Sequence, residues 1–509
     1  MDAEGSELGR LSEGERRFEA VRRRVGLVAA PLVFLALLFL PMTTLEPQAH
    51  RLAAVMATVI VLWITEALPL PVTALLGVAA CVFLQVAPAK DAFAPFADPL
   101  MLLFIGSFIL ARAIFLHGLD RRLAFAVLSL RWVGARPGRI LFAFGAATAF
   151  ISAWISNTAT TAMMFAIGMS ILAFLDVDRG QTGRSGKAID HRYATGLMLM
   201  TSFAASIGGL ATPIGTPPNL IGLGFIREQI GVPLPFLSWV LLGAPVVVTL
   251  FLFLYAYLNF FCAAGLPAID GGHALLERQR AALGPWTAGQ RSTMTAFGIT
   301  VALWVLPGVV ALTAGEDSEP YRFVSRSLPE AVAALFGAGL LFLLPGNGGR
   351  RALTWDEAVQ IDWGVVLLYG GGFALGVLSS QTGLAESVGR GLTGWLPVGS
   401  GGFGLLLAST VVAALVSETT SNTASANIVV PVVIAVARAT GLDPLEPALG
   451  ATFGASLGFM LPVSTPCNAI VYGSGYVPLG RMIRYGALLD VVGVVVIVGL
   501  VRLMAPLLR

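Results

Sequence analysis

Charged residues are scarce in this chain of 509 residues: only 12% are Asp, Glu, Lys or Arg, against roughly a quarter in soluble domains. Hydrophobic residues make up 56%, and apolar runs of about 20 residues, long enough to cross a bilayer, recur along the chain. The short alternating segments of a membrane β-barrel are absent. The sequence therefore predicts an all-α polytopic protein in a lipid bilayer, and we expect no nucleic-acid partner.

Cysteine and histidine are also rare. Cys81, Cys262 and Cys467 lie far apart without metal-ligand spacing, so we interpret them as packing thiols. The four histidines are scattered, and no HExxH motif is present. The segment Gly454–Gly458 matches Gly-x-Ser-x-Gly, but a nucleophile elbow needs a strand-to-helix turn, and this copy lies in an apolar run. These absences argue against an enzyme.

The N-terminal segment 1–24 is polar and ends in three arginines. The following apolar run, Val25–Met42, is interpreted as a retained first span, because a cleavable signal would have a shorter core and a small-residue cleavage site. Basic residues ahead of a span favour a cytoplasmic N-terminus. We therefore expect a protein of the plasma (inner) membrane.

The most informative pattern is a motif that occurs twice. Ser-Asn-Thr-Ala at 156–159 returns at 421–424, an offset of 265 residues (157 to 422), which also maps Gly106 to Gly371 and Ser152 to Ser417. The doubling predicts a first membrane repeat at 25–262, a polar linker at 263–292 and a second repeat at 293–509.

A second pair of motifs follows each copy. Thr-Pro-Pro-Asn at 216–219 corresponds to Thr-Pro-Cys-Asn at 465–468, and Ala-Ser-Ile-Gly at 205–208 is aligned with Ala-Ser-Leu-Gly at 455–458. Proline lacks the N–H and clashes with the preceding turn, so a regular helix does not continue through these motifs. Non-helical backbone at membrane depth survives only where protein or a water-filled cavity covers it. We therefore predict two interrupted elements in each half, as in secondary transporters.

Two local features stay open. The segment 98–116 is compatible with either a hairpin or a kinked span. Glu66 is compatible with an interfacial cap or with a structural hydrogen bond or gate, because ionisable groups at membrane depth are costly. For the glycines at 106 and 370–372 close helix packing is favoured over a functional role.

Basic residues are missing from the central segments: Lys and Arg are absent from 140–178, 193–226, 391–437 and 439–480. A ligand held there meets amides, hydroxyls and helix termini, which bind anions when bound Na⁺ adds positive charge. Glu418 has only Ala153 as its counterpart, which argues against a proton relay. A single Ser-Asn-Thr would suggest helix packing, but two copies in register favour a site. Thr160, Thr161 and Ser425 are assigned to packing.

On these motifs the chain resembles the divalent anion–sodium symporters, the family of dicarboxylate, citrate and sulfate carriers. The resemblance rests on both Ser-Asn-Thr motifs, on 215–219, on 464–468 and on Thr-Glu-Ala-Leu-Pro at 65–69. It implies about eleven spans and two re-entrant hairpins in inverted repeats, a homodimer, and an elevator-type movement. Cys467 departs from the family, which often has proline there.

The resemblance also implies the site residues. The substrate would contact Asn157, Thr158, Thr216, Pro217, Asn422, Thr423, Thr465 and Pro466. Na⁺, the expected coupling ion with no organic cofactor, would bind at Ser152, Ser156, Asn157 and Gly215 in one half, and at Ser417, Thr420, Asn422 and Ser464 in the other.

The predicted function is sodium-coupled symport of di- or tricarboxylates, with C4-dicarboxylates such as succinate or malate preferred. A sodium-independent dicarboxylate exchanger and a sulfate symporter are the alternatives. A channel is disfavoured, because a doubled, uncharged central site suits occlusion better than a continuous pore.

Overall fold

The computed structural model describes residues 13–42, 45–181, 191–265, 272–392 and 402–508. Within these ranges the regular elements are helices, apart from one isolated bridge between Pro345 and Arg351, which confirms the all-α prediction. Ten described helices are long and apolar enough to cross a membrane, or eleven if the bent pair α15 (Glu319–Ser327) and α16 (Glu330–Leu343) forms one span. The ten are α3 (Pro47–Thr65), α6 (Pro99–Leu116), α9 (Asn157–Gln181), α10 (His191–Gly208), α12 (Phe236–Phe261), α14 (Ala288–Ala314), α18 (Trp363–Gln381), α20 (Gly402–Thr419), α21 (Asn422–Ala439) and α24 (Leu479–Met504).

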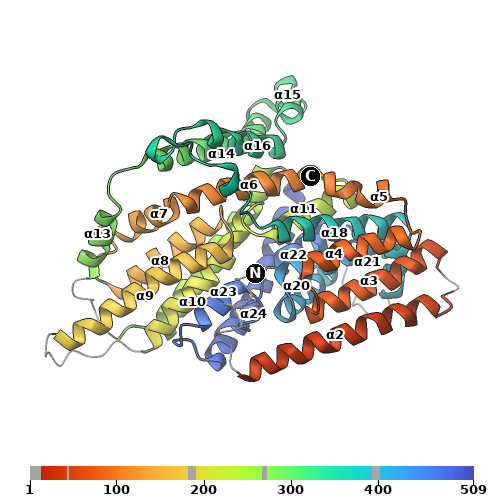
Figure 1. The fold of residues 1–509 in the computed structure, drawn as a ribbon, viewed down its shortest axis with the longest axis horizontal. Coiled ribbons are helices and arrows are strands. Elements are labelled where there is room, and N and C mark those ends of the chain that lie inside the picture. The colour runs from red at the N-terminus through yellow and green to blue at the C-terminus, as the bar shows by residue number, and fades with distance from the viewer. Residues whose placement is uncertain (1–12, 43–44, 182–190, 266–271, 393–401, 509) are drawn as a thin grey trace.

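The two halves of the chain interleave rather than forming separate lobes (Figure 1). Helices from the second half, including α20, α22 (Leu445–Gly454), α23 (Pro466–Tyr472) and α24, lie near the centre of the view. The first-half helices α7 (Leu119–Leu128), α8 (Pro137–Ser152), α9 and α10 lie on one side, and α2 (Glu13–Phe39), α3 and α4 (Leu70–Phe83) lie on the other. Helices α14, α15 and α16 run along the upper edge.

The N-terminal helix is longer than the predicted first span. It begins at Glu13, so the described part of segment 1–24 continues directly into Val25–Phe39; residues 1–12 and 43–44 lie outside the described ranges. Arg22 Nη2 lies 2.7 Å from Glu66 Oε2, and Glu66 ends α3 with a left-handed φ of 47°. Glu66 is therefore both a helix end and one partner of an ion pair between α2 and α3.

Two corresponding helix contacts, one at Gly106 and one at Gly371, each join the first half of the chain to the second. Helix α16 packs on α6, where a Cβ on Gly106 would lie 2.7 Å from the Cβ of Ala334. Helix α4 packs on α18, where a Cβ on Gly371 would lie 2.6 Å from the Cβ of Ala74. Each contact joins one half to the other, and no side chain fits between the helices. The packing interpretation of these glycines agrees with this geometry.

The predicted interruptions are confirmed in all four places. Helix α8 stops at Ser152 before α9, and α20 stops at Thr419 before α21. Helix α10 is followed by a 3₁₀ turn and further turns before α11 (Pro217–Phe225), and a non-helical stretch likewise separates α22 from α23. Each of these last two segments resumes with proline at its first helical position, where the missing N–H costs nothing.

Two segments named from the sequence, 98–116 and the proposed linker 263–292, contain helices. Residues 99–116 form one continuous helix rather than a hairpin, because α6 has no break before Gly118, whose φ is 63°. The proposed linker 263–292 contains α13 (Gly272–Ala282) and the start of α14, and residues 266–271 lie outside the described ranges. Helix α9 ends at Gln181 and α10 begins at His191, and residues 182–190 between them also lie outside the described ranges.

Candidate functional site

The Ser-Asn-Thr motifs have the same geometry in both halves. In each, a serine at the end of one helix bonds the asparagine that begins the next: Ser152 Oγ donates to Asn157 Oδ1 at 2.7 Å, and Ser417 Oγ to Asn422 Oδ1 at 2.8 Å. The serine before each asparagine caps the new helix, since Ser421 Oγ accepts from Ala424 N and Ser156 Oγ accepts from Ala159 N. The motif therefore ends one helix, starts another and places an amide in the gap.

The second pair of breaks is held by two fully buried asparagines. Asn219 Nδ2 donates to the carbonyls of Gly209 and Thr212 at 2.9 and 2.8 Å. In the second half, Asn468 Nδ2 donates to the carbonyls of Gly458 and Leu461, both at 2.9 Å. Irregular backbone exposes carbonyls, and one side-chain amide satisfies two of them in each half. The sequence contains these asparagines in its motifs but gives them no role of their own.

These bonds correct one alignment. The partners lie ten and seven residues before the asparagine in both halves, so the offset is 249 throughout, and Gly209 corresponds to Gly458. The pairing of 205–208 with 455–458 is therefore wrong by one residue. Runs of Ala, Ser and Gly align in several registers by sequence, and only the hydrogen bonds select one of them.

Within each half the two breaks touch. A Cβ on Gly209 would lie 2.4 Å from Asn157 Oδ1, and one on Gly458 would lie 3.3 Å from both Asn422 Oδ1 and Ser417 Oγ. Each Ser-Asn-Thr gap therefore lies directly against the broken helix of its own half, and the absence of a side chain at these glycines permits this approach.

All four breaks border one cavity of about 930 Å³, a volume within the range of small-molecule sites. Its lining includes every residue predicted to contact substrate: Asn157, Thr158, Thr216, Pro217, Asn422, Thr423, Thr465 and Pro466. Cys467 and Ser206 also line it, and all three cysteines are buried and free. The structure thus gathers the predicted substrate residues of both halves, up to 309 positions apart (157 to 466), around one space.

The residues predicted to bind Na⁺ divide into two groups. Ser156, Asn157, Gly215, Asn422 and Ser464 line the cavity, whereas Ser152, Ser417 and Thr420 lie behind the lining and are buried. Both sets offer only hydroxyl, amide and backbone oxygens, the donors that hard cations prefer. At Gly215 a Cβ would lie 2.5 Å from Gly209 O, so only glycine lets these two backbone segments meet. The donor chemistry fits a small hard cation in each half, and in the first half the close backbone approach at Gly215 fits it as well.

Glu418 distinguishes the second half from the first. Its carboxylate accepts hydrogen bonds from Met460 N at 2.7 Å, Leu461 N at 3.2 Å and Ser464 Oγ at 2.5 Å, and the residue is buried. In the first half Ala153 offers only its backbone, whose carbonyl accepts from Thr212 Oγ1. Sequence reasoning noted the absence of an acidic counterpart, but it missed this network, because the partners lie 42 to 46 residues away.

The cavity lining carries very little charge. Among the described residues that form it, Arg112 on α6 is the one cation and Asp362 the one carboxylate. The central segments are free of Lys and Arg as the sequence indicates, but a neighbouring helix supplies a guanidinium that those segments lack. No signal in the sequence associates residue 112 with the motifs.

An apolar helical bundle whose broken helices surround one polar cavity with little charge has the architecture of a secondary transporter. The chain belongs to the sodium:sulfate symporter family: the model of that family's transmembrane region matches residues 22–508. The resemblance drawn from the motifs is thereby confirmed.

Similar proteins agree with this assignment. The sodium-dependent dicarboxylate transporter SdcS of Staphylococcus saprophyticus is 30% identical over 497 residues, which cover 97% of this chain and 93% of that protein. SdcS of Staphylococcus aureus is 30% identical over 491 residues, covering 95% and 91%. The crystal structure of the YdaH transporter of Alcanivorax borkumensis, described as having an unusual topology, matches with a TM-score of 0.51 at 15% identity, covering 82% of this chain and 88% of that one. These relatives are transporters, which confirms that the chain is not an enzyme.

Proposed function

We propose that the protein is a sodium-coupled symporter of di- or tricarboxylates, and that C4-dicarboxylates such as succinate or malate are its preferred substrates. The observation that carries the proposal is the convergence of both Ser-Asn-Thr motifs and both Thr-Pro breaks on one cavity. The 30% identical relatives named sodium-dependent dicarboxylate transporters support the choice of ion and substrate.

The proposed sodium sites and the anion site share Asn157 and Asn422, and these shared residues couple ion binding to substrate binding. The Asn157 and Asn422 side chains each have one face toward a buried serine and line the cavity that receives the substrate. Na⁺ bound at each serine–asparagine pair orders the gap and adds positive charge beside the carboxylates. Thr158, Thr423 and the amides at the two proline-initiated helices then donate hydrogen bonds to the anion.

We infer that the cavity faces the cytoplasm. The start of α4, the end of α6 and the segment before α18 contribute Leu70, Phe115 and Gln360 to its lining. The end of α6 is followed by five arginines between 121 and 139, and such clusters favour the cytoplasmic side. This orientation agrees with a cytoplasmic N-terminus, because the Arg22–Glu66 ion pair places the start of α2 beside the end of α3.

The repeated contacts support a moving unit and a fixed one. We propose that the two halves are inverted repeats and that the protein is a homodimer. In each protomer, α6, α18 and the helices packed on them form the fixed scaffold. The segments from α8 to α11 and from α20 to α23 then move together as an elevator. The glycine contacts at Gly106 and Gly371 join α16 to α6 and α4 to α18, which suits a rigid scaffold.

Uptake of labelled succinate into proteoliposomes without internal substrate tests the proposal. An inward Na⁺ gradient should drive accumulation, and replacement of Na⁺ by choline should abolish it. Uptake that ignores Na⁺ and requires preloaded dicarboxylate would instead identify an exchanger. Sodium-driven uptake of sulfate without succinate or citrate uptake would identify a sulfate carrier.

A further inference from the structure

The position of the cavity's single cation suggests a role for it. Arg112 lies in the last turns of α6, outside the four broken segments, and lines the cavity together with Phe108 and Phe115 of the same helix. A dianion bound between the uncharged tips meets no cationic side chain there. On its way between the tips and the cytoplasm, however, it passes a guanidinium.

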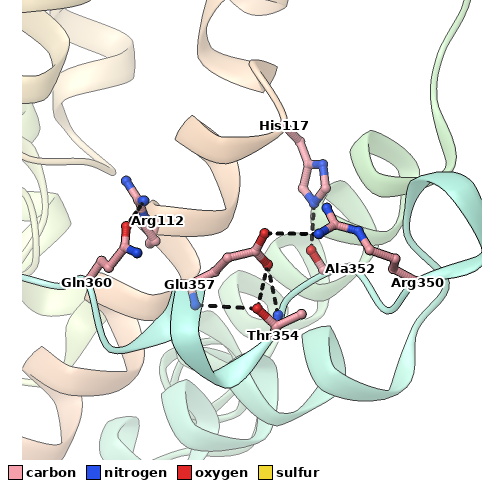
Figure 2. Close-up of polar contacts among 7 residues, drawn as sticks. All are labelled: Arg112, His117, Arg350, Ala352, Thr354, Glu357 and Gln360. Carbon is pink, nitrogen blue, oxygen red and sulfur yellow. Dashed lines mark hydrogen bonds and ion pairs between the residues drawn. The ribbon is translucent and has the colours of Figure 1, made fainter.

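The charge of Arg112 is poorly compensated. Its Nη2 donates to the side-chain oxygen of Gln360, a neutral group, and Figure 2 shows this contact between α6 and the segment before α18. Its buried Nε has no hydrogen-bond partner within the described ranges. Asp362, the carboxylate in the lining, uses Oδ1 to cap α18 by accepting from Val365 N at 3.1 Å. The guanidinium therefore retains both charge and donors for a ligand.

The segment that carries Gln360 is held against the end of α6. A ring nitrogen of His117 lies 2.7 Å from the carbonyl oxygen of Ala352, and Thr354 and Glu357 form a capping box at α17 (Trp355–Ala358) (Figure 2). Gln360 follows α17 by two residues. These contacts anchor Gln360, whose side-chain oxygen accepts a hydrogen bond from Arg112 but does not neutralise the guanidinium charge.

We propose that Arg112 is a docking site for the anion in the cytoplasm-facing cavity: one carboxylate of the substrate replaces Gln360 on the guanidinium as the molecule passes between the asparagine and threonine tips and the cytoplasm. This inference rests on the proposed function. A cation beside a low-dielectric cavity raises the association rate of an anion, and the effect decreases as salt screens it. Arginine suits this role because its planar donors match a carboxylate in two-point contact.

The test measures association of succinate with the purified full-length protein at constant Na⁺, by stopped-flow tryptophan fluorescence, with choline chloride added to vary ionic strength. Trp154 lies in the α8–α9 break and provides a local signal. Arg112→Gln is compared with Arg112→Lys, which keeps the charge, and with Arg350→Gln. This last variant removes a nearby exposed guanidinium that pairs with Glu357 and does not line the cavity.

The Arg112→Gln variant should bind succinate roughly tenfold more slowly at low ionic strength, with its dissociation rate changed less than about twofold. The difference from wild type should disappear at about 0.5 M salt. Arg112→Lys should keep most of the salt dependence, and Arg350→Gln should behave as wild type. An unchanged association rate in Arg112→Gln, or the same loss in Arg112→Lys, overturns the proposal. If the wild-type protein binds neither succinate nor citrate, the proposed function itself fails, and this inference fails with it.

Discussion

The hydroxyl of Ser464 donates a 2.5 Å hydrogen bond to the carboxylate of Glu418, and the two residues lie 46 positions apart in the chain. The first half has no equivalent, because Ala153 and Gly215 occupy the corresponding positions. The two proposed sodium sites therefore differ: in the second, a buried carboxylate is hydrogen-bonded to Ser464, one of the proposed Na⁺ ligands. The repeat in the sequence conceals this asymmetry, and the first prediction follows from it.

Replacement of Glu418 by Gln should weaken the second sodium site and destabilise the fold. The carboxylate accepts from two backbone amides as well as from Ser464, whereas Gln presents one oxygen and one NH₂ group to the same donors. Loss of a hydrogen bond to a charged group costs about 1.5–3 kcal/mol. We expect a lower thermal midpoint and a higher Na⁺ concentration for half-maximal uptake. Glu386→Gln, at an exposed position on α19 (Leu384–Leu392), is the control, and equal behaviour of the two variants would contradict the role of Glu418.

Asn157→Ala and Asn422→Ala should each abolish transport while the protein stays folded. Each side chain both faces a buried serine and lines the cavity, so its removal affects ion and substrate together. Uptake into proteoliposomes and size-exclusion chromatography measure the two properties. Asn259→Ala, at an exposed position on α12, should transport normally. Near-normal uptake by either variant would show that the replaced asparagine does not bind the ion or the substrate.

Ser152→Ala and Ser417→Ala should raise the sodium requirement without changing substrate preference. Both serines are fully buried behind the cavity lining, and each donates to the asparagine of its own half. One neutral hydrogen bond contributes about 1 kcal/mol, so the Na⁺ concentration for half-maximal uptake should rise about fivefold. Uptake is measured over a range of Na⁺ concentrations. If neither variant shifts this curve, the exchanger becomes the better explanation.

Asn468→Ala should destabilise the protein more than Asn219→Ala. Both amides donate to two backbone carbonyls, but Asn468 Oδ1 also accepts from Ser202 Oγ at 2.6 Å, whereas Asn219 Oδ1 has no partner within the described ranges. We expect about 2–3 kcal/mol for the loss at Asn219 and about 1 kcal/mol more at Asn468. Thermal unfolding of the two variants and of Ser202→Ala measures the difference. A larger loss at Asn219 would contradict this account of the breaks.

Acid should loosen the loop before α18. Backbone and side-chain hydrogen bonds from Thr354, with the charge of Arg350 nearby, lower the pKa of Glu357 below its usual value, burial opposing them (Figure 2). A lowered folded-state pKa stabilises the fold above the ordinary glutamate pKa of about 4.3, and this stabilisation is lost as the pH falls through the folded-state value. Protection of the amides at residues 354–358 from hydrogen exchange, taken relative to the intrinsic rate at each pH, should therefore decrease below about pH 4.3 in the wild type.

The variant Glu357→Gln provides the comparison for that measurement. Its side chain does not titrate, so the protection of the amides at 354–358 should depend much less on acidity. This protection should already be lower at neutral pH, because the charged cap is missing. Identical acid dependence in both proteins would show that another group controls this loop.

Much of the architecture is determined by the sequence alone. Long apolar runs require helices in a bilayer, because backbone groups there must bond within their own segment. Pro217 and Pro466 require a break before each, and two Ser-Asn-Thr motifs in one register indicate a repeated unit with a shared site. The cavity-lining residues in the broken segments could be predicted from the sequence, because each belongs to a short local motif.

Other features were decided by tertiary structure. The network of Glu418 and the presence of Arg112 in the cavity depend on partners tens to hundreds of residues away. The correct alignment of Gly209 with Gly458 depends on hydrogen bonds that form only when the chain folds back across each break. Local sequence determines where a helix stops, since propensity and the missing proline N–H act over a few residues. Which hydroxyl or guanidinium then reaches an exposed backbone or a cavity depends on how helices pack, and short-range patterns carry no record of that packing.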